Sequence, residues 1–153
     1  NQIYNGQFYF VSGGLVSRLI SSVDQGATWN ASKLPYPSCP TCGPYAMAIP
    51  NEAEIMTVGG SYLEANNAQN TCFYSKDGGK TWQAPKKGPS GYRSCVIYAE
   101  NKYFACGTNG IDVSKNDGKT WKKISNVNAL SMTFSNEQLY VTLAGGSWLI
   151  LPH

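Results

Sequence analysis

The chain has 153 residues, of which 14% are charged, and its formal net charge is +3. This length fits one domain with its own hydrophobic core, and no apolar run approaches the 18 or so residues that a membrane span needs. We therefore expect no membrane contact. Most lysines lie within residues 76–123, but the chain has only two arginines, Arg18 and Arg93, which argues against a nucleic-acid partner.

Four hairpins are predicted in succession, each made of two apolar runs around a turn that contains Asn. They cover residues 3–13, 46–59, 95–107 and 130–145. Apolar and polar residues alternate along the runs, for example in residues 139–143, and Asn tolerates the positive φ angle of a tight turn. No segment keeps a helical period over three turns, so the sequence predicts almost no helix.

A shorter motif with the pattern S-x-[DN]-x-G-x-T-W follows three of these hairpins. Its Asp or Asn can accept hydrogen bonds from its own loop, its Gly can adopt positive φ, and its Trp can pack between neighbouring sheets. Each turn offers one carboxylate without a second ligand at fixed spacing, which favours a structural role over metal binding or catalysis. The motif residues are Ser22, Asp24, Gly26, Thr28, Trp29, Ser75, Asp77, Gly79, Thr81, Trp82, Ser114, Asn116, Gly118, Thr120 and Trp121.

The repeat has the length of a four-stranded propeller blade. The hairpins close on glycines at positions 13, 59, 107 and 145, which gives spacings of 46, 48 and 38 residues. The third strand of each blade is expected to lead into the motif, over residues 16–22, 71–75 and 111–114. We predict a single propeller domain over residues 1–153, with blades at about 1–34, 44–86, 92–125 and 127–153.

The repeated motif resembles the Asp box, or BNR repeat, of the sialidase-like β-propeller superfamily, and the repeats cover almost the whole chain. The resemblance implies an all-β propeller of about four Asp-box blades. It does not specify a chemistry, because the superfamily includes sialidases, other glycoside hydrolases, sortilin-type receptors and non-catalytic assembly factors. A sialidase would be expected to clamp its substrate carboxylate with three arginines, and this sequence has two.

Catalytic groups are sparse. The only histidine is His153, the last residue, which leaves no credible base for a Ser-His or Cys-His mechanism. Glu52, Glu100 and Glu137 occupy the equivalent hairpin turn of three blades, where we interpret them as solvated charges on one rim. We therefore predict no catalytic residue, no metal site and no cofactor.

The five cysteines favour an oxidising compartment. Together with Asn1 in place of an initial Met, and the sequon at Asn30, they predict a processed, secreted chain that can carry an N-glycan at Asn30. Cys39 and Cys42 have the spacing of a zinc knuckle, but no second pair follows, so the sequence favours a small loop disulfide.

Two further cysteines, Cys95 and Cys106, flank the Glu100-Asn101 turn symmetrically and are predicted to face each other across their hairpin. Both a cross-strand disulfide and two free thiols are compatible with this placement. Cys72 is then the leftover thiol, which we expect to be buried in the third strand of its blade.

The functional prediction rests on aromatic residues at loops and strand ends, because tyrosines beside Asn and Gly suit stacking on sugar rings. Ordinary rim aromatics are the alternative interpretation. The candidate ligand contacts are Tyr45, Tyr62, Tyr92, Arg93 and Trp148.

We predict a secreted, non-catalytic binding module for a glycan or a protein. One alternative is a fragment or subunit of a sialidase-like glycoside hydrolase whose active-site residues lie largely outside this chain, and another is a structural or assembly-factor propeller. The first and last repeats are both shorter than a full blade, so we expect a second chain or a symmetry mate to complete the propeller.

Overall fold

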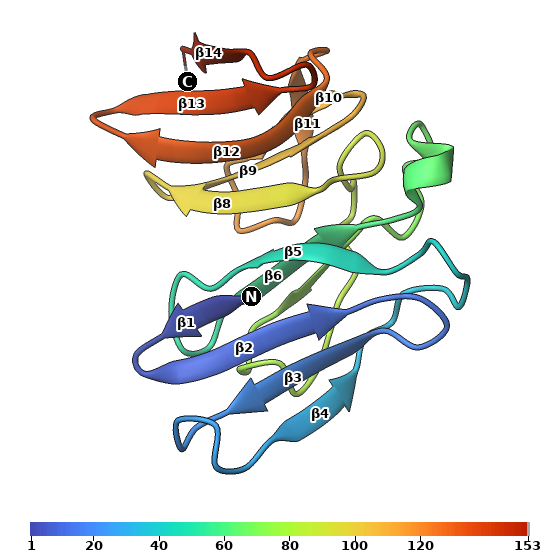
Figure 1. The fold of residues 1–153 in the computed structure, drawn as a ribbon, viewed down its shortest axis with the longest axis vertical. Coiled ribbons are helices and arrows are strands. Elements are labelled where there is room, and N and C mark those ends of the chain that lie inside the picture. Colours follow the sequence, from blue (N-terminus) through green and yellow to red (C-terminus); the bar gives the residue numbers. More distant parts are fainter. Residues whose placement is uncertain (153) are drawn as a thin grey trace.

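The protein is all-β, as the computed structural model shows for residues 1–152. His153, the only histidine, lies outside the described residues. Four antiparallel sheets follow one another along the chain (Figure 1), and the only helical element within residues 1–152 is the 3-10 turn η1 (Tyr62–Glu64). No helix in this part of the chain is long and apolar enough to cross a membrane.

Each sheet is one propeller blade, with its strands in sequence order. Blade 1 contains β1 (Gln2–Tyr4), β2 (Gln7–Ser12), β3 (Arg18–Ser22) and β4 (Asn30–Lys33). Blade 2 contains β5 (Pro44–Ala48), β6 (Ile55–Gly59) and β7 (Cys72–Ser75). Blade 3 contains β8 (Cys95–Ala99), β9 (Lys102–Gly107), β10 (Gly110–Ser114) and β11 (Lys122–Ser125). Blade 4 contains β12 (Ala129–Ser135), β13 (Gln138–Leu143) and β14 (Trp148–Leu151).

The fourth strand of blade 2 is reduced to a single bridge. Gln83 exchanges two backbone hydrogen bonds with Tyr74, each 2.9 Å long. The predicted third strands are present as β3, β7 and β10, within two residues of the expected bounds.

Three of the four predicted hairpins form around tight turns with left-handed backbone, whereas residues 49–54 connect the two strands of the hairpin in blade 2. Both central residues have positive φ at Asn5-Gly6 (47° and 75°), Glu100-Asn101 (48° and 57°) and Asn136-Glu137 (47° and 58°). Such turns match the right-handed twist of the flanking strands, which sets the register of each hairpin. In blade 3 this register places Cys95 directly opposite Cys106.

The core lies between consecutive blades in three clusters. The first joins blades 1 and 2 through Tyr9, Leu19, Met47, Ile55 and Phe73. The second joins blades 2 and 3 through Met56, Val58, Cys72, Tyr103 and Trp121. The third joins blades 3 and 4 through Phe104, Cys106, Ile111, Met132 and Val141.

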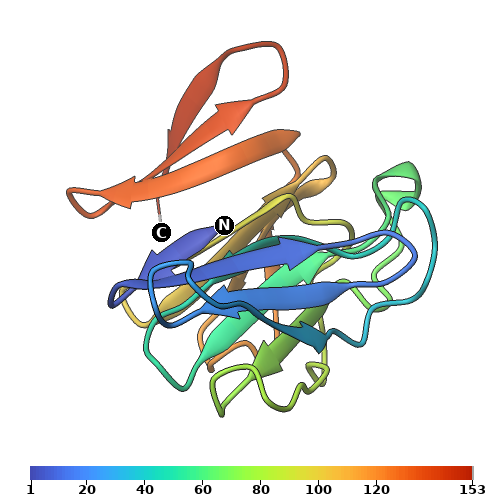
Figure 2. The same ribbon diagram turned by 60° about the horizontal axis from the view of Figure 1, so that its bottom comes forward.

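Burial follows the position of each blade in the row. Every residue of β6 and β10, in the two middle blades, is buried, whereas β12 and β13 of blade 4 contain two buried residues each and β14 contains none. A strand with a neighbour on both faces needs apolar residues throughout, and a strand covered on one face needs them at every second position. Blades 1 and 4 lie at opposite ends of the row in Figure 1, and Figure 2 shows blade 4 at the top of the view, above the other three blades.

Candidate functional site

The Asp boxes are closed turns in which the acidic group is fully engaged by its own loop. In blade 2, Asp77 Oδ1 accepts hydrogen bonds from the Thr81 amide (2.8 Å) and the Lys80 amide (3.0 Å), while Oδ2 accepts from the Thr81 hydroxyl (2.6 Å). Ser75 donates to the same carboxylate (2.8 Å) and accepts from the Gly79 amide (2.8 Å). These donors favour the charged form and lower the pKa of Asp77 to about 2.

The other two boxes repeat this arrangement. The pKa of Asp24 is also lowered to about 2, mainly by the hydroxyl and amide of Thr28. In the third box Asn116 accepts from the Thr120 amide (2.9 Å). An acid that is saturated by backbone and hydroxyl donors stabilises its turn and has little capacity left for a ligand.

The three box tryptophans differ in burial, which corrects the expectation that each packs between two blades. Trp121 is 2% exposed and lies between blades 2 and 3, and Trp82 is half-buried against the cluster between blades 1 and 2. Trp29 is 46% exposed, and its ring packs on Phe8 and Phe10 of its own blade. The physical reason is that no described blade covers the outer face of blade 1.

A polar groove of about 380 Å³ lies at the other end of blade 2 from its box. Strand β7 starts at the groove and runs into the box turn, so the two features are at opposite ends of the same strand. The groove is formed by the loop between blades 1 and 2 and by the long connection between β6 and β7. Its lining residues are Pro37, Cys39, Thr41, Cys42, Gly60, Ser61, Leu63, Glu64, Asn67, Gln69 and Asn70.

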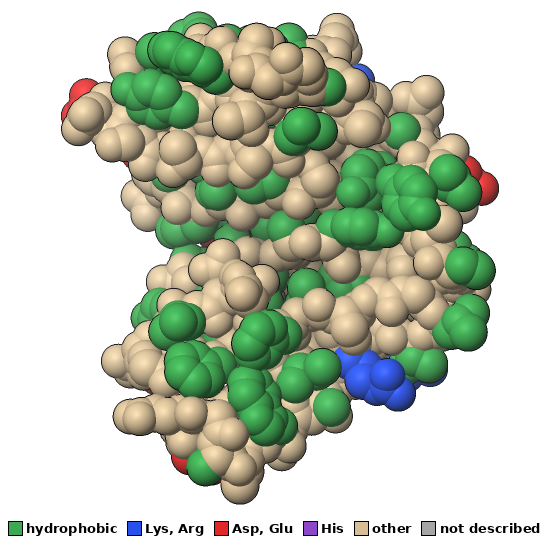
Figure 3. Space-filling view, in the orientation of Figure 1, with side chains coloured by type: hydrophobic (Ala, Val, Ile, Leu, Met, Phe, Trp, Pro, Cys, Tyr) green, Lys and Arg blue, Asp and Glu red, His purple; other side chains and the backbone are tan. Residues whose placement is uncertain are grey.

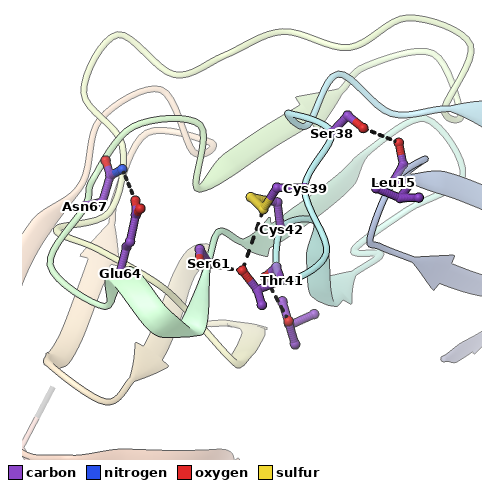
Figure 4. Close-up of a disulfide and its surroundings, with 9 residues drawn as sticks. Leu15, Ser38, Cys39, Thr41, Cys42, Ser61, Glu64 and Asn67 are labelled. Atoms are coloured by element: carbon purple, nitrogen blue, oxygen red, sulfur yellow. Dashed lines mark hydrogen bonds between the residues drawn. A yellow bond between two sulfur atoms is a disulfide. The ribbon is translucent and has the colours of Figure 1, made fainter.

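The wall formed by the interblade loop is held by the Cys39–Cys42 disulfide. Figure 4 shows this loop facing the start of η1, to which it is joined by a 2.8 Å hydrogen bond between the Thr41 and Ser61 hydroxyls. Ser38 ties the same loop to blade 1 by donating to the Leu15 carbonyl (2.8 Å). The disulfide thus stabilises a wall of the groove rather than the blade core.

The opposite wall is the connection between β6 and β7, where side chains close a short helical turn. Asn67 donates to Glu64 Oε2 (2.8 Å) and accepts from the Gln69 amide (3.0 Å) (Figure 4). Asn70, at the end of the connection, has a φ of 53°. This wall therefore presents amides and a single carboxylate at fixed positions.

Three tyrosines form a cluster next to the groove, although none of them is among its lining residues. Tyr45 is 41% exposed and Tyr62 is 51% exposed, and their rings meet edge to face with centroids 6.3 Å apart. Tyr92 is buried behind Tyr45 at 5.0 Å, and burial raises its pKa to about 12. The Tyr45 hydroxyl donates to the Thr41 carbonyl (3.1 Å), which links the aromatic cluster to the groove. Figure 3 shows hydrophobic side chains gathered beside the 3-10 turn.

The other two candidate ligand contacts are placed differently: Arg93 is buried next to Tyr92, and Trp148 is on blade 4. Arg93 is fully buried, and its guanidinium is held by Asp112, by the Asn109 side chain (2.5 Å) and by the Tyr92 carbonyl (2.6 Å). All of its charge is compensated inside the protein, so it anchors the loop before blade 3. Trp148 lies in β14 of blade 4, remote from the groove.

Free thiols occur at three positions. Cys95 and Cys106 face each other across the hairpin without a disulfide, and Cys72 is a buried thiol in β7. The hydrogen bond between the two opposed thiols lowers the pKa of Cys95 and raises that of Cys106. Asn30, the expected glycosylation position, begins β4 and is exposed.

The sequence did not identify the amide residues of the groove, namely Asn67, Gln69 and Asn70. The available signal was the length of one connection. Between β6 and β7 the chain needs residues 60–71, whereas β9 and β10 are joined by residues 108–109 alone. A long connection at a single blade indicates a surface feature beyond the needs of the fold. Among residues 1–152, no group of three His, Cys, Asp or Glu side chains could hold a metal ion.

Comparison with known proteins agrees with this architecture. Residues 73–84 match the family model of the BNR/Asp-box repeat. No curated protein matches the chain in sequence.

Several solved propellers share the fold at low identity. The structure of YCF48 bound to D1 peptide has a TM-score of 0.62 at 15% identity and covers 97% of this chain and 46% of its own length. YCF48 from Cyanidioschyzon merolae has a TM-score of 0.56 at 15% identity, with 98% and 54% covered. The NanB sialidase from Streptococcus pneumoniae has a TM-score of 0.60 at 15% identity, with 95% and 29% covered. The chain thus spans about half or less of each of these proteins. It carries the Asp-box repeat and has the sialidase-like β-propeller fold.

Proposed function

We propose that the chain is a secreted, non-catalytic propeller module that binds carbohydrate in the groove beside η1. The observation that carries this proposal is the pairing of two exposed tyrosine rings, Tyr45 and Tyr62, with a groove lined by amides and hydroxyls. Aromatic rings stack on the apolar faces of sugars, and amide and hydroxyl groups exchange hydrogen bonds with sugar hydroxyls.

The charge of the groove supports an uncharged or weakly basic ligand. Among its described lining residues, Glu64 is the one ionisable side chain outside the disulfide. A hydrolytic mechanism on glycosides uses two carboxyl groups within about 10 Å, so this lining supports binding rather than bond cleavage. Burial of Arg93 with Asp112 also leaves that arginine unable to clamp an acidic sugar.

The disulfide and the exposed Asn30 support an extracellular location, because proteins on the secretory pathway acquire both disulfides and N-glycans before export. Secretion is tested by mass spectrometry of the chain from a secreting host. We expect an oxidised Cys39–Cys42 pair and a glycan mass on Asn30, and Asn30→Gln should remove the glycan mass alone.

Carbohydrate binding is tested with a glycan array, followed by titration calorimetry with the best neutral oligosaccharide. Tyr62→Ala should weaken binding about tenfold, as expected for the loss of one stacked ring. Glu64→Gln should weaken it less if the carboxylate only accepts hydrogen bonds. The matched control is Tyr98→Ala, since Tyr98 is 36% exposed and lies by the Glu100-Asn101 turn at the box end of blade 3. Equal losses in Tyr62→Ala and Tyr98→Ala, or no glycan bound at all, would contradict the proposal.

A peptide is the second candidate ligand, because one of the structurally similar propellers was solved with a bound peptide. The Tyr62→Ala variant distinguishes the two classes of ligand. If the ligand is a peptide, the Tyr62-dependent signal should appear with a peptide library and not with the glycan array.

The enzyme alternative is addressed by a panel of sialosides and aryl glycosides. We expect no turnover above buffer, and turnover that is lost in Glu64→Gln would establish hydrolysis instead.

A further inference from the structure

Positive charge in this protein is concentrated on blades 2 and 3. Residues 76–123 contain nine of the ten lysines together with Arg93 and four acidic residues, which gives this stretch a formal charge of +6. The rest of the chain has a formal charge of −3. The groove beside η1 does not use the positive charge, because no lysine is among its described lining residues. The charged stretch is therefore a separate feature of the surface.

The acidic residues of this stretch leave most of its lysines unpaired. Asp112 is 1% exposed and compensates Arg93. The other salt bridges of the stretch involve Lys76, Lys102 and Lys119. Within residues 1–152, no salt bridge involves its six remaining lysines, all of which are exposed: Lys80, Lys86, Lys87, Lys115, Lys122 and Lys123. These ammonium groups are available to an anion from outside the chain.

Four of these six lysines lie where the outer edges of blades 2 and 3 meet. The Lys87 amide donates a hydrogen bond to the Lys119 carbonyl (3.4 Å), and the Trp121 amide donates to the Lys87 carbonyl (3.0 Å). This contact holds the segment after the second Asp box against the residues that lead into β11, the outermost strand of blade 3. The first two residues of β11 are lysines as well. We call Lys86, Lys87, Lys122 and Lys123 the lysine seam.

Packing limits the freedom of one seam residue. The stem of Lys123 crosses Gly110, where an added Cβ would lie 2.7 Å from Lys123 Cε. A long cationic side chain whose stem is already packed loses less conformational entropy when its ammonium group binds a ligand. The seam is therefore partly arranged for binding before a ligand arrives.

Protection of a sheet edge explains only half of the seam. Lysines on an outer strand discourage pairing with another sheet, and Lys122 and Lys123 lie on such a strand. Lys86 and Lys87 do not, because the amide and the carbonyl of Lys87 are already bonded to blade 3. A role in binding accounts for all four lysines.

The side chains of the seam fit sulfate groups better than nucleic acid. Ammonium groups are compact point charges, whereas nucleic-acid recognition adds arginine forks and rings that stack on bases. The seam contains no arginine, and the ring that precedes β11, Trp121, is 2% exposed. The Cys39–Cys42 disulfide favours a place outside the cell, whereas the anionic lipids that attract basic surfaces face the cytoplasm.

We propose that the lysine seam binds the sulfate groups of a linear sulfated polysaccharide. Four cations along the edges of two adjoining blades suit an extended row of anions better than a single small ion. The seam shares no residue with the groove, so this inference does not depend on ligand binding there. The choice of partner rests on the extracellular location proposed above, which mass spectrometry of the secreted chain tests separately.

Titration calorimetry of the 153-residue chain with a heparin oligosaccharide is the first test. We expect binding that weakens as NaCl is raised, with a slope of log affinity against log salt of about −3 for four lysine contacts. Heparin from which the sulfate groups have been removed keeps its carboxylates and should bind at least about tenfold more weakly. No binding of heparin, or equal binding of the desulfated probe, would overturn the proposal.

Paired substitutions locate the contact. Lys86→Gln/Lys87→Gln and Lys122→Gln/Lys123→Gln should each weaken heparin binding about tenfold and make the salt slope shallower by about 1–2. Circular dichroism and the thermal midpoint show whether each variant keeps the fold. If the substitutions in β11 disturb it, the pair at 86 and 87 carries the test, since these residues lie outside the strands. Unchanged affinity in a folded seam variant would overturn the proposal.

The matched control is Arg18→Gln/Lys33→Gln. It removes the same charge from two exposed residues that are cross-strand partners on blade 1. Because this pair lies outside the seam, the control should lose no more than about half of the affinity for heparin. Equal losses in the control and in the seam variants would show that heparin responds to net charge alone, and this result would overturn the seam as a site.

Other polyanions identify the class of partner. Single-stranded oligo(dT) and vesicles that contain phosphatidylserine are compared with heparin at the same NaCl concentration. We expect both to bind at least about tenfold more weakly, because the seam offers neither exposed rings for bases nor an apolar anchor for lipid. Equal or tighter binding of either probe would overturn the assignment to a sulfated polysaccharide.

Discussion

The Asn116 side-chain amide donates a 2.8 Å hydrogen bond to Thr120 Oγ1 in the third Asp box. In the second box the direction is reversed, because the Thr81 hydroxyl donates to Asp77 Oδ2 at 2.6 Å. A threonine hydroxyl can serve as donor or acceptor, so the turn closes with either residue at the acidic position. The carboxylate is therefore not required for the shape of the box, but it makes the stability of two boxes depend on pH.

Asp77→Asn should make the stability of the protein depend less on pH in the acidic range. The pKa of Asp77 is about 2 in the folded chain, below the ordinary value of about 3.9 for an unfolded Asp. The stabilisation by the carboxylate is therefore present above about pH 4 and is lost as the pH falls toward 2. Unfolding midpoints between pH 2 and 7 should change less with pH in the variant, and still less in Asp24→Asn/Asp77→Asn. An unchanged profile in the double variant would show that the boxes do not contribute.

The box tryptophans should differ in their effect on stability. Trp121→Ala removes a ring that is 2% exposed, and we expect it to lower the free energy of unfolding by about 3–5 kcal/mol. Trp29→Ala removes a ring that is 46% exposed and should cost less than half as much. Urea unfolding of the two variants and the parent chain measures both costs. Equal costs would contradict the difference in burial between the two rings.

The buried Arg93–Asp112 pair should be sensitive to the loss of one partner. Arg93→Ala leaves Asp112, which is 1% exposed, as an uncompensated buried charge, and we expect a loss of about 3–5 kcal/mol. The control is Lys76→Ala, because Lys76 pairs with Glu54 and Asp117 at the surface and should cost under about 1 kcal/mol. Partial recovery in Arg93→Ala/Asp112→Asn would confirm that the cost comes from the unpaired carboxylate.

The opposed thiols should form a disulfide on mild oxidation. Cys95 and Cys106 are direct cross-strand partners, so a disulfide oxidant such as oxidised glutathione can accept two electrons and two protons from them and join their sulfur atoms. Cys72 should stay reduced, because burial raises its pKa and hinders access. Mass mapping of peptides after alkylation checks both outcomes. A Cys72 adduct formed at the same rate, or no loss of mass at the Cys95–Cys106 pair, would contradict this expectation.

Local chemistry determined the repeating parts of this protein. Apolar alternation and Asn-containing turns predict each hairpin, because period-two patterning and positive φ act within a few residues. The boxes were equally predictable, since Ser75, Asp77 and Thr81 satisfy one another inside eight residues. The buried Cys72 and the Cys39–Cys42 disulfide followed from the same short-range reasoning.

Tertiary packing decided everything that depends on which segments meet. The groove lies between residues 37–42 and residues 60–70. No sequence pattern within either segment predicts that the two segments lie next to each other. The charge of Arg93 is neutralised by Asp112, which lies nineteen positions away along the chain. Arg93 is therefore not available at the surface as a ligand contact, the role that the sequence suggested for it. Trp29 and Trp121 occupy the same position of the Asp-box motif, yet one is exposed and the other buried, because burial between blades depends on the neighbouring sheet and not on the motif itself.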